Sequence, residues 1–153
     1  MKLLLALTTL LTTAALLSAS DETSGVSFVE HDKVAVALSK AGPIVGLEGT
    51  GTYNVHISRR VKPGPAEAHV KDTDFFYILE GSATVIAGGT MVGGKETRPG
   101  LIVGSDIRGG QTYHLSKGDV MVIPAGIPHW FKEVPTSIDY YTVQAAVEPS
   151  KAK

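Results

Sequence analysis

The feature that most constrains the fold is a succession of short β-rich runs that fills the chain from Val26 onward. Val, Ile, Thr, Tyr and Phe favour strands, and Gly, Pro, Asn and Asp interrupt them every few residues. No heptad and no sustained 3.6-residue period runs through this region. We therefore expect an all-β fold. Strands are predicted at 27–30, 34–39, 51–59, 66–69, 74–78, 82–87, 112–115, 120–123, 129–134 and 140–145.

Many short strands of this kind usually close into a sandwich or barrel, because closure removes exposed strand edges. A jelly-roll β-barrel is the leading candidate. The glycine-rich segment 88–110 is predicted to be a long hairpin connection with a short strand at 101–103. The alternative for this segment is a flexible flap over the mouth of the barrel, since long loops often carry function.

Composition excludes several classes of partner and site. The chain has 153 residues, the size of one ordinary domain, and a formal net charge of -1. Its largest basic cluster is the pair Arg59 and Arg60, so no nucleic acid partner is expected. Because cysteine is absent, thiol chemistry and sulfur-ligated metals are excluded. A metal must therefore be held by nitrogen and oxygen atoms.

The first twenty residues, MKLLLALTTLLTTAALLSAS, have the pattern of a signal peptide. Lys2 precedes an apolar stretch, and the small residues Ser18 and Ser20 suit a signal peptidase. The apolar stretch is shorter than the ~20 residues that span a bilayer, so a retained anchor is the less favoured alternative. We expect cleavage after Ser20, a mature domain over 21–153, and a secreted or periplasmic protein with no membrane association after signal removal.

The segment KGDVMVIPAGIPHWF, from Lys117 to Phe131, places a histidine at the start of a strand. Pro124 must end the preceding strand, because proline cannot donate to a β-ladder. Gly126 can supply a positive φ in the turn. With alternating orientation, His129 and Phe131 share one face of the next strand.

The spacing in this segment resembles the second signature of the cupin superfamily, G(x)5PxG(x)2H. Gly118, Pro124, Gly126 and His129 occupy its fixed positions. The first signature, G(x)5HxH(x)3-4E(x)6G, is present in degenerate form in PGPAEAHVKDTDFFYILEG, upstream. The resemblance covers about residues 40–145, and it implies a small cupin-type jelly-roll barrel that holds one divalent metal ion.

Within the first signature, His69 and Gly81 match, while Glu67 replaces a histidine, Asp74 replaces the glutamate and Val61 replaces the opening glycine. Glu67 and His69 are two positions apart, so both project to the same face of a strand.

A charged Asp74 inside an apolar barrel would be costly unless a cation paired with it. We predict His69, Asp74 and His129 as metal ligands. Glu67 is the candidate catalytic base or a fourth ligand, and its alternative is a surface position. The metal is copper, iron, manganese, nickel or zinc, and a barrel that has lost its metal remains an alternative.

Both faces of the run DFFYIL are apolar. Phe76 and Ile78 are expected to fill the barrel, which leaves Phe75, Tyr77 and Leu79 to be covered from outside. An exposed apolar patch usually marks an interface, so a homodimer is expected. The remaining histidines are expected to be structural or solvent-facing, although His56 is also placed to line the cavity.

The leading hypothesis is a secreted, mononuclear metal-dependent cupin enzyme. Oxidoreductase chemistry with oxygen or peroxide comes first, on a small organic or carbohydrate substrate, with oxidative polysaccharide cleavage as one form of it. A lyase or isomerase is the second choice. A non-catalytic cupin that binds a sugar, small acid or metal is a separate class, and a structural dimer without ligand is a third.

Overall fold

Strands contain most of the residues in the computed structural model, which describes residues 26–39, 42–48 and 52–146, with backbone alone for 42–48. The predicted signal peptide and Gly51, the start of one predicted strand, lie outside the described residues. Helix α1 (His31–Leu38) comes first. The strands are β1 (Gly42–Glu48), β2 (Tyr53–Arg60), β3 (Ala66–His69), β4 (Asp72–Ala87), β5 (Thr90–Val92), β6 (Lys95–Arg98), β7 (Leu101–Gly104), β8 (Asp106–Arg108), β9 (Gln111–Ser116), β10 (Val120–Ile123), β11 (His129–Glu133) and β12 (Ile138–Ala146).

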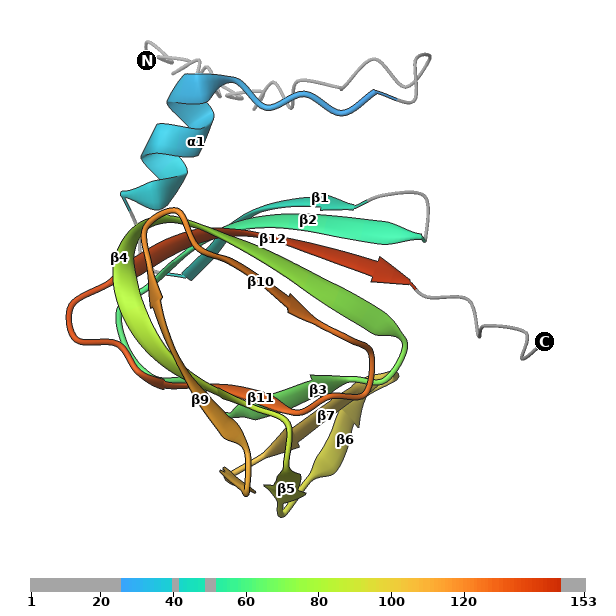
Figure 1. Ribbon diagram of the computed structural model, residues 1–153. Helices are drawn as coiled ribbons and strands as arrows, with labels where there is room; N and C mark the ends of the chain where they lie inside the picture. The colour runs from blue at the N-terminus through green and yellow to red at the C-terminus, as the bar shows by residue number, and fades with distance from the viewer. Residues whose placement is uncertain (1–25, 40–41, 49–51, 147–153) are drawn as a thin grey trace, which may run out of the picture.

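The strands pair antiparallel and curve around a common interior, as Figure 1 shows. The main path of pairing is β1-β2-β12-β4-β11-β3-β7-β6, and β9 and β10 also pair with β4. The expected β-rich jelly-roll architecture is confirmed. Within the described strands the hydrogen-bonded path begins at β1 and ends at β6, so no continuous ladder closes the barrel.

Strand β4 connects the two sides of the molecule. Its first half pairs with β10 and β12, and its second half pairs with β9 and β11. The sequence predicted two strands here, at 74–78 and 82–87, but the structure has one strand that bends at Gly81. Gly81 has φ of 80°, which residues with a Cβ adopt only at a cost. The bend therefore keeps the ladder continuous through the predicted turn.

Two strands predicted near the start of the described chain are wrong. Residues 26–30 have no regular structure, and most of the predicted strand at 34–39 is helical. The alternation of valines with alanines suggested a strand, yet alanine and leucine are strong helix formers. Val34, Ala37 and Leu38 have the i, i+3, i+4 spacing of one helix face, and they are the least exposed residues of α1. This face packs against β1 and β2 (Figure 1).

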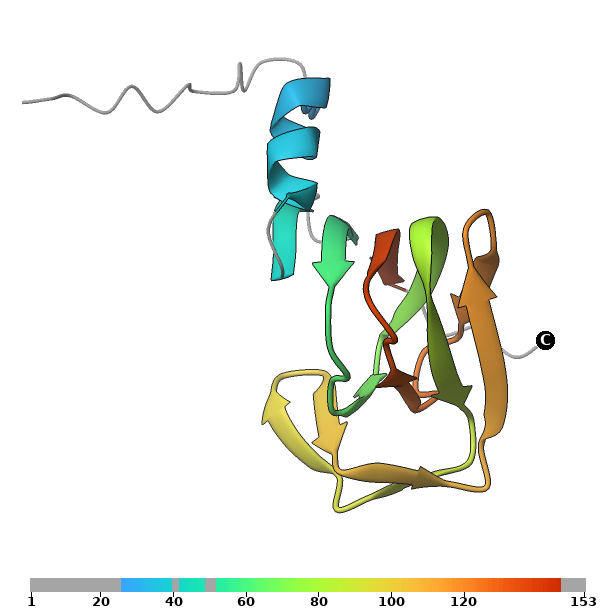
Figure 2. The ribbon, with the colours of Figure 1, turned by 90° about the vertical axis from the view of Figure 1, so that its left-hand side faces the viewer.

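The glycine-rich segment 88–110 is ordered into four short strands. The predicted strand at 101–103 is confirmed as β7, which pairs with both β3 and β6. The short strands β5 and β8 pair with each other. Figure 2 shows this group at the opposite end of the molecule from α1. The segment is thus a structured extension of the barrel rather than a simple hairpin connection.

The core lies between the two sides of the barrel. As expected, Phe76 and Ile78 are buried in it, together with Val85, Phe131 and Tyr140. The rings of Phe76, Phe131 and Tyr140 contact one another and also form part of a cavity wall. These aromatic side chains thus separate the packed core from an open interior. In the part of the chain that the structure describes, no helix has the length and apolarity to cross a membrane.

Candidate metal centre

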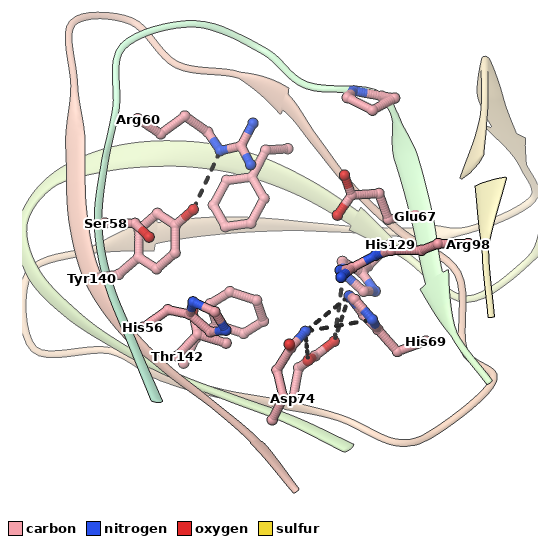
Figure 3. Close-up of a pocket in the computed structure, with 14 residues that line it drawn as sticks. His56, Ser58, Arg60, Glu67, His69, Asp74, Arg98, His129, Tyr140 and Thr142 are labelled. Atoms are coloured by element: carbon pink, nitrogen blue, oxygen red, sulfur yellow. Dashed lines mark hydrogen bonds and ion pairs between the residues drawn. The ribbon is translucent and has the colours of Figure 1, made fainter. Parts of the chain in front are cut away.

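A cavity of about 260 Å³ lies in the space that the strands surround, and Figure 3 shows the residues that line it. Residues at every second position of the neighbouring strands face it, as the alternation of side chains in a strand requires. The cavity brings together all four residues that the sequence singled out, Glu67, His69, Asp74 and His129. Their gathering in one cavity makes it the candidate functional site.

Glu67, His69 and His129 form the tightest group of potential ligands. One donor atom from each residue lies within 4.8 Å of the donor atoms of the other two. Glu67 and His69 project from β3 on the same face, and Glu67 is paired directly with His129 of β11. The group therefore follows from one strand pairing and one period-2 spacing, and its three donors can hold a metal ion.

Asp74 lies next to this group and is 1% exposed. Its Oδ2 atom is 3.6 Å from Nε2 of His129 and 3.8 Å from Nε2 of His69. Two ligands of a tetrahedral ion at about 2.1 Å from each ligand atom lie roughly 3.4 Å apart. The separations in the site are close to this value, so the Asp74 carboxylate is near enough to each imidazole to share an ion with it, although Asp74, a predicted ligand, lies outside the group of three donors that converge within 4.8 Å.

Gln144 of β12 completes the site and was not predicted. Its Nε2 atom donates to Oδ1 of Asp74 at 2.9 Å and lies 3.0 Å from Nε2 of His69. The register of β12 against β4 places Gln144 directly opposite Asp74. Tyr140, Thr142 and Gln144 alternate along the predicted strand at 140–145, and this spacing is the sequence signal that could have indicated a shared face.

The turn before β11 orients His129. Strand β10 ends at Ile123, immediately before Pro124, as predicted, and Gly126 has φ of 80°. The Gly126 N–H donates to the His69 carbonyl oxygen at 2.7 Å, which ties the turn to β3. Nδ1 of His129 lies 3.3 Å from the Ile127 carbonyl oxygen. With its hydrogen on Nδ1, His129 presents the lone pair of Nε2 to Asp74, an arrangement typical of metal-binding histidines.

Burial shifts the pKa of two of these groups. Burial lowers the pKa of His129 to about 4, so its imidazole is neutral near pH 7 and has no proton to lose before it binds a metal. Burial also raises the pKa of Asp74, against the opposing effects of His69 and of the hydrogen bond from Gln144. A cation in the site would offset the cost of burying the Asp74 carboxylate.

The other histidines lie in different surroundings. His56 is half-buried on β2 and lines the cavity, which was one of its two predicted positions. His31 is exposed on α1. His114 is exposed on β9, with its Nδ1 3.3 Å from the Thr84 hydroxyl. His56 therefore shares the cavity with the ligand group, whereas His31 and His114 do not line it.

Comparisons with known proteins agree with this architecture. The family model described as "Cupin" matches residues 34–138, well over half of the chain. The chain is similar to the Schizosaccharomyces pombe Cnp3 cupin domain, with a TM-score of 0.50 and 15% identity over 67% of this chain and 63% of that chain. It is also similar to protein NMB1881 from Neisseria meningitidis, with a TM-score of 0.52 and 9% identity over 78% of this chain and 100% of that chain.

A third structure, the DMSP lyase DddQ from Ruegeria pomeroyi, has a TM-score of 0.45 and 13% identity over 69% of this chain and 43% of that chain. The chain thus spans less than two thirds of the Cnp3 and DddQ chains. No curated protein matches the sequence.

Proposed function

This chain belongs to the cupin family, and on that premise we propose that it is a metal-dependent oxidoreductase acting on a small organic molecule. The observation that carries the proposal is the gathering of Glu67, His69 and His129 in the cavity, with donor atoms within 4.8 Å of one another. Two imidazoles with a carboxylate are a donor set used for iron(II), and they also suit manganese, copper and zinc. Three protein ligands leave one position of a four-coordinate ion free for a substrate or for oxygen, and a six-coordinate ion keeps free positions even with four protein ligands.

A bound divalent ion would supply the redox or Lewis-acid chemistry. The chain's own residues would orient the reactants and handle protons. The hydrogen bond from Gln144 holds Asp74 toward the two histidines. Glu67 is less buried than the other candidate ligands, so its carboxylate can reach both the metal position and the open part of the cavity. A carboxylate so placed can accept a proton from a bound substrate.

The volume of the cavity favours a small substrate over a polysaccharide. One liquid water molecule occupies about 30 Å³, so a cavity of about 260 Å³ holds on the order of ten non-hydrogen atoms. Such a space suits an organic acid, a phenol or part of one sugar ring. We therefore place oxidative attack on a glycan chain below the oxidation of a free small molecule.

The proposed function is tested by metal analysis together with oxygen uptake. We expect about one divalent ion per chain. When a panel of small acids, phenols and sugars is supplied, the protein should consume oxygen faster than the same mixture without protein. Glu67→Gln should weaken metal binding, or lower the rate of oxygen uptake, by at least about tenfold. Glu133→Gln, which changes an exposed carboxylate outside the cavity, is the matched control.

Two outcomes would contradict this proposal. A chain that retains no metal after separate incubation with iron(II), manganese, copper and zinc would exclude the metal centre. Full metal occupancy with ligand binding but no turnover across the panel would instead favour the alternative of a non-catalytic binding module.

We further propose that the chain forms a homodimer through the outer face of β10, β4 and β12. Val120 pairs with Tyr77 and Val122 pairs with Phe75, so these side chains share one face of the sheet. All four are exposed, between 42% and 68%. An apolar patch of adjacent strands on a monomer's surface usually marks an interface. A cleaved signal peptide and a location outside the cytoplasm also remain part of the proposal.

The dimer is tested by the effect of a charge on this outer face. Tyr77→Glu should shift the mass in sedimentation equilibrium from that of a dimer to that of a monomer, because it buries a carboxylate without a partner. Thr90→Glu, on the exposed part of β5, should leave the dimer intact. A wild-type chain that sediments as a monomer at all tested concentrations would contradict the proposal.

A further inference from the structure

Arg60 is a cation that faces the cavity without an acidic partner in the described part of the chain. Its neighbour Arg59 lies on the other face of β2 and forms a two-pronged ion pair with Asp139. The distances are 2.7 Å from Nε to Oδ1 and 2.7 Å from Nη2 to Oδ2. Asp139 thus neutralises Arg59, whereas the positive charge of Arg60 faces the cavity.

Contacts with uncharged groups hold Arg60 in place. Its guanidinium carbon lies 4.8 Å from the centre of the Phe131 ring, and its Nε is 3.4 Å from the Tyr140 hydroxyl. Nη1 lies so close to Gly64 that a Cβ at that position would collide with it. Figure 3 shows Arg60 across the cavity from the metal-ligand group. The guanidinium is thus positioned but not neutralised.

The charges of the cavity favour a negatively charged ligand. A divalent ion at the candidate metal centre would balance the carboxylates of Glu67 and Asp74. Arg60 and Arg98, the two arginines that line the cavity, would then remain unbalanced. A planar guanidinium binds a carboxylate through two parallel hydrogen bonds, which gives geometry as well as charge.

The wall beside Arg60 is aromatic. The rings of Phe131 and Tyr140 are stacked, with 5.4 Å between their centres and 17° between their planes. Phe76 contacts both rings. Such a wall suits the apolar or planar body of a ligand whose charged end reaches Arg60.

We propose that the cavity binds a small organic carboxylate, with its carboxyl group on Arg60, its body along Phe131 and Tyr140, and its other end toward Glu67, His69 and His129. The orientation of the ligand rests on the proposed function, because the metal centre defines the reacting end. The charge selectivity rests on Arg60 itself. The two parts can therefore be measured separately.

The experiment compares benzoate with its neutral analogue benzamide by isothermal titration calorimetry, on zinc-loaded and on EDTA-treated protein. Benzoate should bind at least about tenfold more tightly than benzamide. Arg60→Met should weaken benzoate binding by about 10- to 100-fold and leave benzamide binding and zinc content unchanged. Lys62→Met, which removes an exposed charge outside the cavity, should change neither affinity.

Gly64→Ala provides a second variant that keeps every charge. The added Cβ should displace the guanidinium and so weaken benzoate binding, even though Gly64 has an ordinary backbone φ that alanine can adopt. This variant separates the position of Arg60 from its contribution to net charge.

The outcomes for the two proposals differ. A preference for benzoate that survives Arg60→Met but is lost when EDTA removes the zinc would place the carboxylate on the metal and overturn the inference. Equal affinities for benzoate and benzamide would also overturn it. Failure to retain zinc, iron(II), manganese or copper would contradict the proposed function alone, because the dependence on Arg60 would still be read from the EDTA-treated protein.

Discussion

Replacing His129 with alanine is expected to reduce the affinity for a divalent ion by at least about 100-fold. Removing groups that only orient a ligand already costs about 10- to 100-fold in affinity, and His129 is itself a candidate ligand. His129 belongs to the donor group with Glu67 and His69, and its Nε2 also lies 3.6 Å from Oδ2 of Asp74. Loss of this imidazole therefore removes a donor whichever carboxylate binds the ion.

The measurement is zinc binding by competition with a chromogenic chelator, after EDTA treatment of each variant. His114→Ala is the matched control, because it removes an exposed imidazole that does not line the cavity. Circular dichroism and thermal unfolding establish that the variants are folded, and His129→Asn offers a more conservative change at the buried position. Wild-type zinc affinity in folded His129→Ala would exclude His129 as a ligand.

The gathering of the four candidate residues in one cavity could be predicted from the sequence because they are connected by short-range patterns. Glu67 and His69 share a face of one short strand, so their spacing alone places them together. The turn residues before His129 fix where its strand begins. Asp74 follows His69 closely, and the resemblance to the cupin signatures placed all four residues in one barrel. Each of these patterns involves few residues, and none requires knowing which strands pair across long stretches of sequence.

Gln144 and Arg60 could not be predicted as parts of the site, because their positions depend on long-range register. Alternation indicates which residues of β12 or β2 share a face, but not whether that face is inside the barrel. Only the pairing of β12 with β4 places Gln144 opposite Asp74. Similarly, Arg59 and Arg60 are indistinguishable in sequence, and the partner Asp139 lies eighty positions away.

Helix α1 was predicted incorrectly for a different reason. Its residues satisfy a strand pattern through alternating valines and a helix pattern through Val34, Ala37 and Leu38. An eight-residue segment is too short for periodicity to decide between the two. Packing against β1 and β2 favours the helix, since these contacts bury its narrow apolar face. This error concerns an element outside the cavity and so left the predicted ligands unaffected.

Gly81 connects the fold to the metal centre. Asp74 belongs to the half of β4 before this glycine, whereas β11, which carries His129, pairs with the half after it. The bend at Gly81 therefore sets how the two halves of the site face each other. A Cβ added at Gly81 would collide with the Ser137 carbonyl oxygen, and the next residue, Ser82, donates its N–H to the same oxygen at 3.2 Å.

Gly81→Ala is expected to lower the free energy of unfolding by about 3 kcal/mol, or to prevent folding, because it combines a strained φ with a collision against backbone. Gly100→Ala is the matched control, since Gly100 also has φ of 80° but has open space where a Cβ would lie. The control should lose only about 1 kcal/mol, measured by urea unfolding. Equal losses in the two variants would show that φ strain alone accounts for the effect and that the approach of Ser137 does not constrain this bend. A larger loss in Gly81→Ala would establish that close backbone packing at the bend requires glycine in addition to its φ. The alignment of Asp74 with His129 would then depend on this glycine.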